Sequence, residues 1–317
     1  MMKEYGGYIQ FETNYGEEYY TNLLRLNCAR NCLAFLIEAR GIKKIYFPFF
    51  LCGTVKEICD RYKIDYECYH IDKDFRPIFK KKLNEYEYIY VVNYYGQFGK
   101  NDILDFKGRF TNLIVDNVQA FFERPINGVD TIYSCRKFFG VPDGAYLSTD
   151  SKLMFHYETD TSYDRMHFLL GRFEKDASDF YSEYVQNNEL FDSEPIKFMS
   201  KLTRNLLKGI DYEIIKEKRE KNFQYLHERL GNRNELHITL PIGPFAYPLQ
   251  IKDGKSVRKK LIEKKIYIPL LWPEILEVCK CDVLEYRLAC DVLSLPIDQR
   301  YNEDDMQYIY EKICETV

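Results

Sequence analysis

The stretch Leu113-Ile114-Val115-Asp116-Asn117-Val118-Gln119 is a short apolar run that ends in a carboxylate and an amide. A run of this kind, bounded by polar residues, is typical of a buried strand in a parallel sheet. A second predicted strand, 131–133, leads into the turn Ser134-Cys135-Arg136-Lys137. Asp116 and Lys137 are therefore both expected at carboxyl ends of strands, where α/β sheets bind their ligands.

A carboxylate and an amine at such strand ends are the two groups that pyridoxal phosphate requires. The coenzyme needs an amine for its aldehyde and an anion facing its ring nitrogen, so that the protonated ring draws electrons from the substrate carbon. Lys137 and Asp116 supply both groups. Two simpler interpretations stay open, because a lysine after a strand is usually only solvated, and Asp116 is also able to cap a helix that begins at Asn117.

Strands alternate with helices over the first half of the chain. We predict strands at 44–47, 65–71, 86–93, 113–116, 131–133 and 144–148, and helices at 32–40 and 55–62. This alternation predicts an α/β fold, with a mainly parallel sheet sandwiched by helices. Residues 1–26 are polar and rich in tyrosine, and we predict an arm there rather than a core element.

The second half of the chain predicts a different, smaller unit. The pattern favours helices at 196–209, 212–230, 254–265 and 303–315, and strands at 237–240 and 246–251. On 212–230 the apolar line is predicted to run along Ile214, Ile215, Lys218, Phe223, Leu226 and Leu230. We predict a large domain over 1–210, which includes the arm, and a smaller C-terminal α+β domain over 211–317.

Composition excludes several classes of protein. The formal net charge of -4 and the pI near 5.9 argue against a nucleic-acid partner, which would require a clustered basic face. The chain begins without the apolar core of a signal peptide and has no apolar run long enough to span a membrane, so we expect a cytoplasmic protein with no membrane partner. The ten cysteines are then expected as reduced thiols, and the five histidines lack metal-ligand spacing, so no metal is expected.

Further motifs follow in an order that resembles the DegT/DnrJ-type sugar aminotransferases, a branch of the aspartate-aminotransferase-like fold of pyridoxal phosphate enzymes. The resemblance extends over nearly the whole chain and depends on the order of the motifs rather than on any single one. The matching segments are 26–33, 46–52, 70–72, 92–97, 115–120, 133–137, 143–145, 292–297 and 302–305.

The resemblance implies a role for each matching residue. Lys137 is the implied catalytic residue, which bonds to pyridoxal 5'-phosphate and then moves a proton between the substrate carbon and the coenzyme. Asp116 is implied to keep the ring nitrogen protonated, and Gln119 to contact the phenolic oxygen. The other implied contacts are Ser134, Arg136 and the helix start at Ala29, Arg30 and Asn31 for the phosphate, Cys52 at the ring-stacking position, and Tyr95 on the substrate side.

The implied activity is the transfer of an amino group from glutamate or glutamine to a keto group of a nucleotide-linked sugar, in a homodimer with shared active sites. The chain departs from the family pattern at Arg30-Asn31, where a glycine and a threonine are usual, and at Cys52, where an aromatic ring is usual. These departures leave open a non-catalytic binding or regulatory protein that retains the fold. A second alternative is a pyridoxal phosphate-dependent sugar dehydratase, which the presence of Lys137 disfavours. Taken alone, Cys52 is also consistent with a packed thiol and Tyr95 with a strand-end aromatic.

Overall fold

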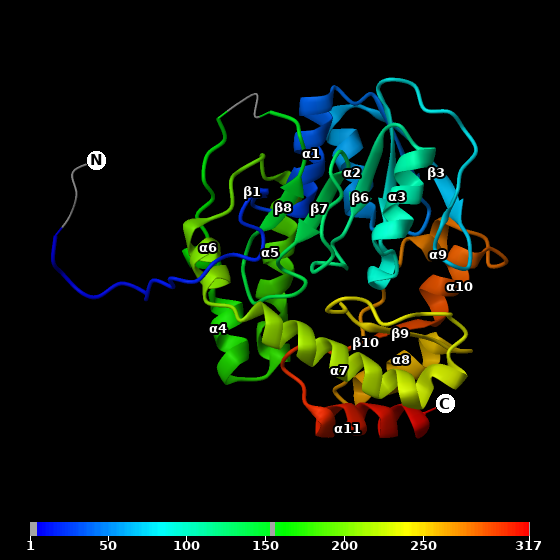
Figure 1. The fold of residues 1–317 in the computed structure, drawn as a ribbon. Coiled ribbons are helices and arrows are strands. Elements are labelled where there is room, and N and C mark those ends of the chain that lie inside the picture. The colour runs from blue at the N-terminus through cyan, green and yellow to red at the C-terminus, as the bar shows by residue number, and fades with distance from the viewer. Residues whose placement is uncertain (1–4, 153–155, 317) are drawn as a thin grey trace.

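The computed structural model describes residues 5–152 and 156–316. Its larger lobe is built on an eight-stranded sheet with the strand order β1-β8-β7-β6-β5-β2-β3-β4 (Figure 1). The central strands β3, β2, β5, β6 and β7 are parallel, while β8, β1 and β4 pair antiparallel with their neighbours. The strands are β1 (Leu24–Leu26), β2 (Lys44–Pro48), β3 (Asp65–Ile71), β4 (Pro77–Ile78), β5 (Glu87–Val92), β6 (Leu113–Asp116), β7 (Asp130–Ser134) and β8 (Ala145–Ser148).

Helices cover both faces of this sheet and bury its central strands. Every residue of β6 and β7 is buried, as expected for strands of a parallel sheet. The helices of this lobe are α1 (Ala29–Arg40), α2 (Gly53–Tyr62), α3 (Lys100–Arg109), α4 (His167–Glu174), α5 (Tyr181–Ser193) and α6 (Lys201–Lys208), with short 3₁₀ turns η1 (Tyr94–Gly96), η2 (Tyr163–Arg165) and η3 (Ala177–Phe180). The predicted α/β class is confirmed.

A smaller lobe follows, with a two-stranded antiparallel sheet and its own helices. In Figure 1 the long helix α7 crosses between the large sheet and α11. The elements are α7 (Tyr212–Leu230), η4 (Gly231–Arg233), β9 (Tyr247–Gln250), α8 (Gly254–Glu263), α9 (Ile275–Val278), α10 (Leu284–Asp291), β10 (Val292–Leu295) and α11 (Glu303–Cys314). The domain boundary between residues 210 and 211 stays a prediction.

Three sequence-based predictions were wrong. Residues 24–26, assigned to the arm, form β1, which pairs with β8 at the edge of the sheet. The helix predicted over 196–209 begins only at Lys201, where the side chain of Ser200 caps it. Residues 237–240 are not a strand, because Thr239 instead exchanges hydrogen bonds with the side chain of Gln97.

The inner face of α7 also differs from the predicted apolar line. Ile214 is 62% exposed, whereas Arg219 and Asn222 face the interior together with Phe223 and Leu226. The helix therefore buries an arginine in the middle of its apolar stripe.

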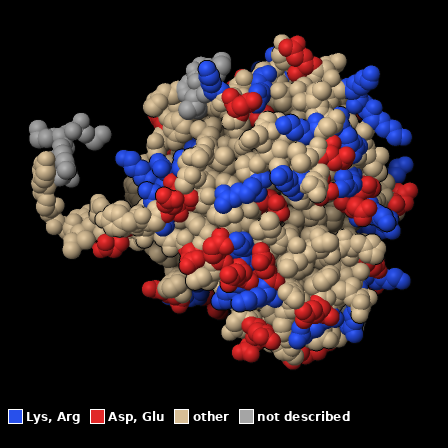
Figure 2. All heavy atoms as spheres, in the orientation of Figure 1, with Lys and Arg blue, Asp and Glu red and all other residues tan. Residues whose placement is uncertain are grey.

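Outside the sheet, the surface carries mixed charge and one projecting segment. Figure 2 shows acidic and basic side chains interspersed over the face drawn, with the N-terminal arm standing off the body. Within residues 5–152 and 156–316, no helix combines the length and the apolar character needed to cross a membrane.

Candidate functional site

Asp116, the last residue of β6, is a buried carboxylate held in one orientation. It is 3% exposed, its Oδ2 accepts a hydrogen bond from the Tyr90 hydroxyl at 2.7 Å, and its Oδ1 accepts one from the Val118 N–H at 2.8 Å. Burial raises the pKa of Asp116, although the Val118 N–H, the Tyr90 hydroxyl and the charge of Lys137 lower it in part. No helix begins at Asn117, so Asp116 closes a turn and the helix-capping interpretation is wrong.

Lys137 lies at the end of the neighbouring strand, in the turn after β7. Its side chain is exposed, and Nζ lies 5.5 Å from the centre of the Phe245 ring. Among the described residues no carboxylate lies within ion-pair distance of Nζ, yet Lys137 is close enough to lower the pKa of Asp116. The structure thus brings the predicted amine and carboxylate together and leaves the amine without a salt bridge in the described part of the chain.

Gln119 and Tyr95 meet beside this pair. The buried Gln119 accepts a hydrogen bond from the Tyr95 N–H through Oε1 at 2.8 Å, whereas its Nε2 is buried without a partner among the described residues. Tyr95 has a φ of 54°, a backbone strain that recurs at functional sites. Its ring, however, is buried, and its hydroxyl lies 2.9 Å from Ser294 Oγ of the small lobe. Tyr95 therefore fixes Gln119 through its backbone, and its substrate-side role stays a prediction.

Two guanidinium groups converge at the start of α1. Arg30 donates to the backbone carbonyl of Asn188 at 2.9 Å and forms an ion pair with Asp192, and Arg136 donates to the side-chain oxygen of Asn188. Arg136 also packs on the Phe191 ring at 4.7 Å, and burial lowers its pKa. Arg136 has no carboxylate within ion-pair distance in the described part of the chain. Helix α5 thus closes over the predicted phosphate residues from the same chain.

The other predicted contacts lie around these groups. Ala29, Arg30 and Asn31 form the first turn of α1, and its N-cap residue Cys28 makes no side-chain cap. The Asn31 side chain turns inward, donating to Asn27 Oδ1 at 2.9 Å and to the Pro195 carbonyl at 2.8 Å, so only its backbone is available to a phosphate. Ser134 is the last residue of β7 and is 8% exposed, and no described side chain hydrogen-bonds to it.

Cys52 follows β2 and precedes the N-terminus of α2. It is half-buried, and its Sγ lies 3.1 Å from Thr54 Oγ1. The pKa of Tyr90 is raised well above its usual range, by burial first and then by Asp116, Cys32 and Cys52. Cys52 therefore lies near the Tyr90 hydroxyl, which donates to Asp116, at the same edge of the sheet. The role of Cys52 at the coenzyme ring stays a prediction.

Four residues of the site were not predicted from the sequence: Tyr90, Asp192, Arg219 and Gln299. Arg219 and Gln299 both donate hydrogen bonds to the carbonyl of Phe138, beside Lys137. Asn188 accepts hydrogen bonds from two arginines of its own chain, Arg30 and Arg136. The available signal for Arg219 was its spacing of four residues from Phe223 on the apolar face of α7.

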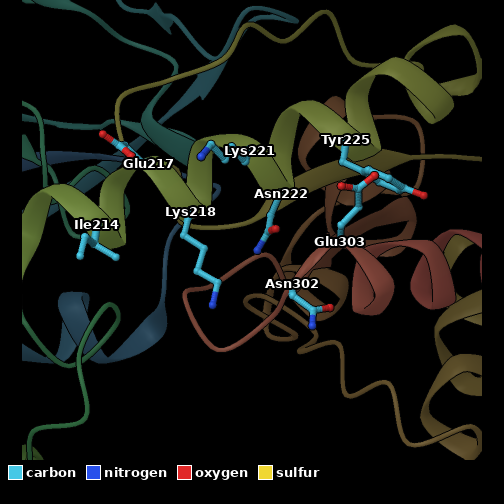
Figure 3. A pocket seen from close by; sticks show the side chains of 8 residues that line it. All are labelled: Ile214, Glu217, Lys218, Lys221, Asn222, Tyr225, Asn302 and Glu303. Carbon is cyan, nitrogen blue, oxygen red and sulfur yellow. The ribbon is translucent and has the colours of Figure 1, made fainter.

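Two surface hollows lie elsewhere. The larger, about 380 Å³, is lined by Ile214, Glu217, Lys218, Lys221, Asn222, Tyr225, Asn302 and Glu303, and Figure 3 shows Lys218 and Asn302 extending into the space between α7 and the start of α11. The second, about 250 Å³, adjoins residues 127–130 and 148–150. Neither contains a predicted site residue, and no buried unpaired polar atom of the described residues lines the larger one.

Comparison with known proteins identifies the fold. No family model and no curated protein matches the sequence. Solved structures do match, among them a DegT DnrJ EryC1 StrS aminotransferase from Brucella abortus at 14% identity and a TM-score of 0.62, covering 92% of this chain and 85% of that one. The sugar aminotransferase CalS13 from Micromonospora echinospora has 14% identity and a TM-score of 0.61, with 93% and 87% covered.

A third match carries a bound cofactor. NtdA from Bacillus subtilis, solved with PMP, has 12% identity and a TM-score of 0.65, with 94% of this chain and 73% of that one covered. At such low identities the likeness establishes the shared fold, and the chemistry has to be argued from the side chains of this chain.

Proposed function

We propose that this chain is a pyridoxal phosphate-dependent aminotransferase that transfers an amino group from glutamate or glutamine to a keto group of a nucleotide-linked sugar. The observation that carries the proposal is the pair at adjacent strand ends, buried Asp116 and an amine at Lys137 with no ion-pair partner among the described residues. The proteins of the same fold named above include a sugar aminotransferase and one solved with PMP, which supports the substrate class and the coenzyme.

The side chains present fit the coenzyme in three places. Gln119 Nε2 is a buried donor that lacks a partner in the described structure, as expected of a group that binds an oxygen of a ligand. Arg136 is a half-buried cation with an amide but no carboxylate within ion-pair distance among the described residues, and a phosphate would neutralise it. The first turn of α1 adds N–H groups at a helix N-terminus, where an anion is favoured.

Each residue then has a chemical task. The coenzyme, when bound, withdraws electrons from the substrate carbon. Asp116 keeps a proton on the ring nitrogen, and its bonds to Tyr90 and Val118 fix the direction in which the carboxylate faces. Lys137 Nζ takes the proton from the substrate carbon and returns it at the other end of the transfer, as a general base and then a general acid.

The proposal is tested by the first half of the reaction. Purified protein is loaded with pyridoxal phosphate and mixed with glutamate or glutamine, and the conversion of the coenzyme to its amine form is followed by absorbance together with the 2-oxo acid released. A panel of keto-sugar nucleotides then identifies the acceptor. Loading without conversion by either donor would favour the dehydratase alternative, and failure to bind the coenzyme would contradict the proposal.

We also propose that the active form is a homodimer. Support comes from large apolar side chains left in solvent on one chain, Leu170 and Phe173 on α4, Tyr181 on α5 and Tyr8 on the arm, which are 58%, 92%, 64% and 97% exposed. Sedimentation equilibrium of the coenzyme-loaded protein tests it, and a monomer at micromolar concentration would contradict it.

Asp192→Asn is expected to strengthen the binding of phosphate and of the coenzyme by about two- to fivefold. In the present structure Asp192 forms an ion pair with Arg30 at the start of α1, so an incoming phosphate competes with that carboxylate. The effect is modest because the Asp192 side chain is 43% exposed. Titration with inorganic phosphate, followed by the shift in thermal unfolding, measures it without any reaction.

The control for this variant is Asp179→Asn, which removes an equal charge from the exposed turn η3. It is expected to leave phosphate affinity unchanged. Equal affinities of Asp192→Asn and wild type would show that Arg30 does not contribute to the phosphate site.

A further inference from the structure

The buried arginine of α7 is unusual in its surroundings. Arg219 is 1% exposed, and every group that it hydrogen-bonds is neutral: Nε donates to Gln299 Oε1 at 2.9 Å, Nη1 to the carbonyls of Pro244 and Phe245 at 3.0 and 3.3 Å, and Nη2 to the carbonyl of Phe138 at 3.2 Å. Burial lowers its pKa to about 10, with Asp298 opposing and Arg300 adding to the shift. Arg219 therefore stays charged at neutral pH.

Such a charge is not the most stable choice for an interior position. A buried ionic group costs desolvation energy, and well-packed apolar side chains of similar volume often stabilise a protein at least as well. The neighbouring acid Asp298 is bonded to Arg300 and not to Arg219. We therefore infer the role of Arg219 from the groups that its guanidinium hydrogen-bonds.

Those groups surround Lys137. Phe138, whose carbonyl accepts from Arg219, is the residue directly after Lys137, and Gln299 Nε2 donates to the same carbonyl at 2.8 Å. Phe245, whose carbonyl also accepts from Arg219, places its ring 5.5 Å from Lys137 Nζ. The guanidinium itself lies 4.7 Å from the Phe138 ring. One side chain of the small lobe thus fixes both the lysine turn and the ring beside the lysine amine.

We propose that Arg219 is a positioning residue that orients Lys137 toward the coenzyme. Its hydrogen bonds hold the lysine turn and Phe245 against helix α7. Gln299 is the second donor to the carbonyl of Phe138. This inference rests on the proposed function. Four acceptors in different directions require a planar group with several donors, which a lysine or a methionine cannot replace.

The experiment compares Arg219→Lys and Arg219→Met with wild type in two measurements. The first is hydrogen exchange over residues 134–140 in the cofactor-free protein, which reports the order of the turn alone. The second is the rate at which the pyridoxal phosphate aldehyde condenses with Lys137 Nζ, releasing water. Borohydride trapping and peptide mass spectrometry measure this rate.

Both variants are expected to speed exchange over 134–140 and to slow attachment at Lys137 by about tenfold or more. Arg219→Lys should not rescue either measurement, although it keeps the charge. The control is Arg258→Met, which removes another buried arginine of the small lobe, on α8. It is expected to leave both measurements at the wild-type values whatever it does to unfolding temperature.

Wild-type exchange and attachment rates in Arg219→Lys and Arg219→Met would overturn the inference. If Arg219→Met fails to fold, Arg219→Lys and Gln299→Leu test the same carbonyl of Phe138. If wild type attaches no coenzyme while exchange over 134–140 rises only in the Arg219 variants, the proposed function fails and Arg219 still orders the turn. If exchange does not change in the Arg219 variants, the positioning role fails by itself.

Discussion

Lys137→Ala is expected to abolish covalent uptake of pyridoxal phosphate and to lower the rate of amino transfer by about 10³-fold or more. The variant removes both the amine that bonds to the aldehyde and the group that moves the proton, and general acid-base catalysis alone typically contributes 10²–10⁴-fold. Folding should not suffer, because the Lys137 side chain is exposed and makes no ion pair with a described residue. Mass spectrometry after borohydride reduction measures the uptake, and single-turnover kinetics with glutamate measure the rate.

Two further variants distinguish the loss of the covalent bond to the coenzyme from the loss of a positive charge. Lys137→Arg keeps a cation over the Phe245 ring but cannot form the bond, so it should behave as Lys137→Ala does. Lys152→Ala removes another exposed lysine in a loop that follows a strand and is expected to retain full uptake and rate. Covalent coenzyme on a lysine other than 137 in the wild-type protein would show that the catalytic residue is assigned wrongly.

The sequence was most informative for segments whose local pattern is long or clearly bounded. The predicted strands 65–71 and 113–116 coincide with β3 and β6, and the predicted helix 212–230 coincides with α7. In each case the local apolar pattern was long enough or clearly bounded, so that tertiary contacts had little to override. The predicted helix 32–40 stops at Gly41, whose φ of 61° explains the termination.

The wrong predictions depend on partners that are distant in the chain. β1 is only three residues long, and its register is set by β8, more than a hundred residues away. Residues 237–240 have the alternation of a strand, but the side chain of Gln97 takes the hydrogen bonds that a neighbouring strand would supply. Neither partner is visible in a local window of sequence.

The candidate site also contains some residues that could be predicted from the sequence and others that could not. Asp116, Gln119 and Lys137 follow predicted strands, so their place at one edge of the sheet could be anticipated. Tyr90 and Arg219 could not be, because Tyr90 reaches Asp116 from the neighbouring strand and Arg219 reaches Phe138 from the other lobe. The predicted apolar line of α7 also pointed to Lys218 rather than Arg219, because an error of one residue rotates the assigned inner face by about 100° and so changes which basic residue faces inward.

Asp116→Asn is expected to lower the rate of amino transfer by about 10²–10³-fold, the usual effect of removing one preorganised electrostatic contact. A neutral amide of the same shape no longer holds a proton on the ring nitrogen, whereas Tyr90 and Val118 still have polar partners. The cofactor-free variant should be at least as stable as wild type at neutral pH, because it avoids the buried charge. Loss of rate together with retained stability is typical of a residue kept for function.

The pH dependence of stability follows from the raised pKa of Asp116. Between 3.8 and that raised value the folded carboxyl keeps its proton while the unfolded one loses it, so wild type loses stability as pH rises through this window. Asp116→Asn lacks this loss, so its advantage in unfolding free energy should vanish below pH 3.8, grow as the pH rises through this window and stay constant above it. Denaturant titrations from acid to neutral pH measure the difference.

The control Asp143→Asn is expected to lose stability instead, because the buried Asp143 accepts hydrogen bonds from the Ser200 N–H and from the Ser200 and Thr203 hydroxyls. A similar loss in Asp116→Asn would indicate that Asp116 serves the fold rather than the coenzyme.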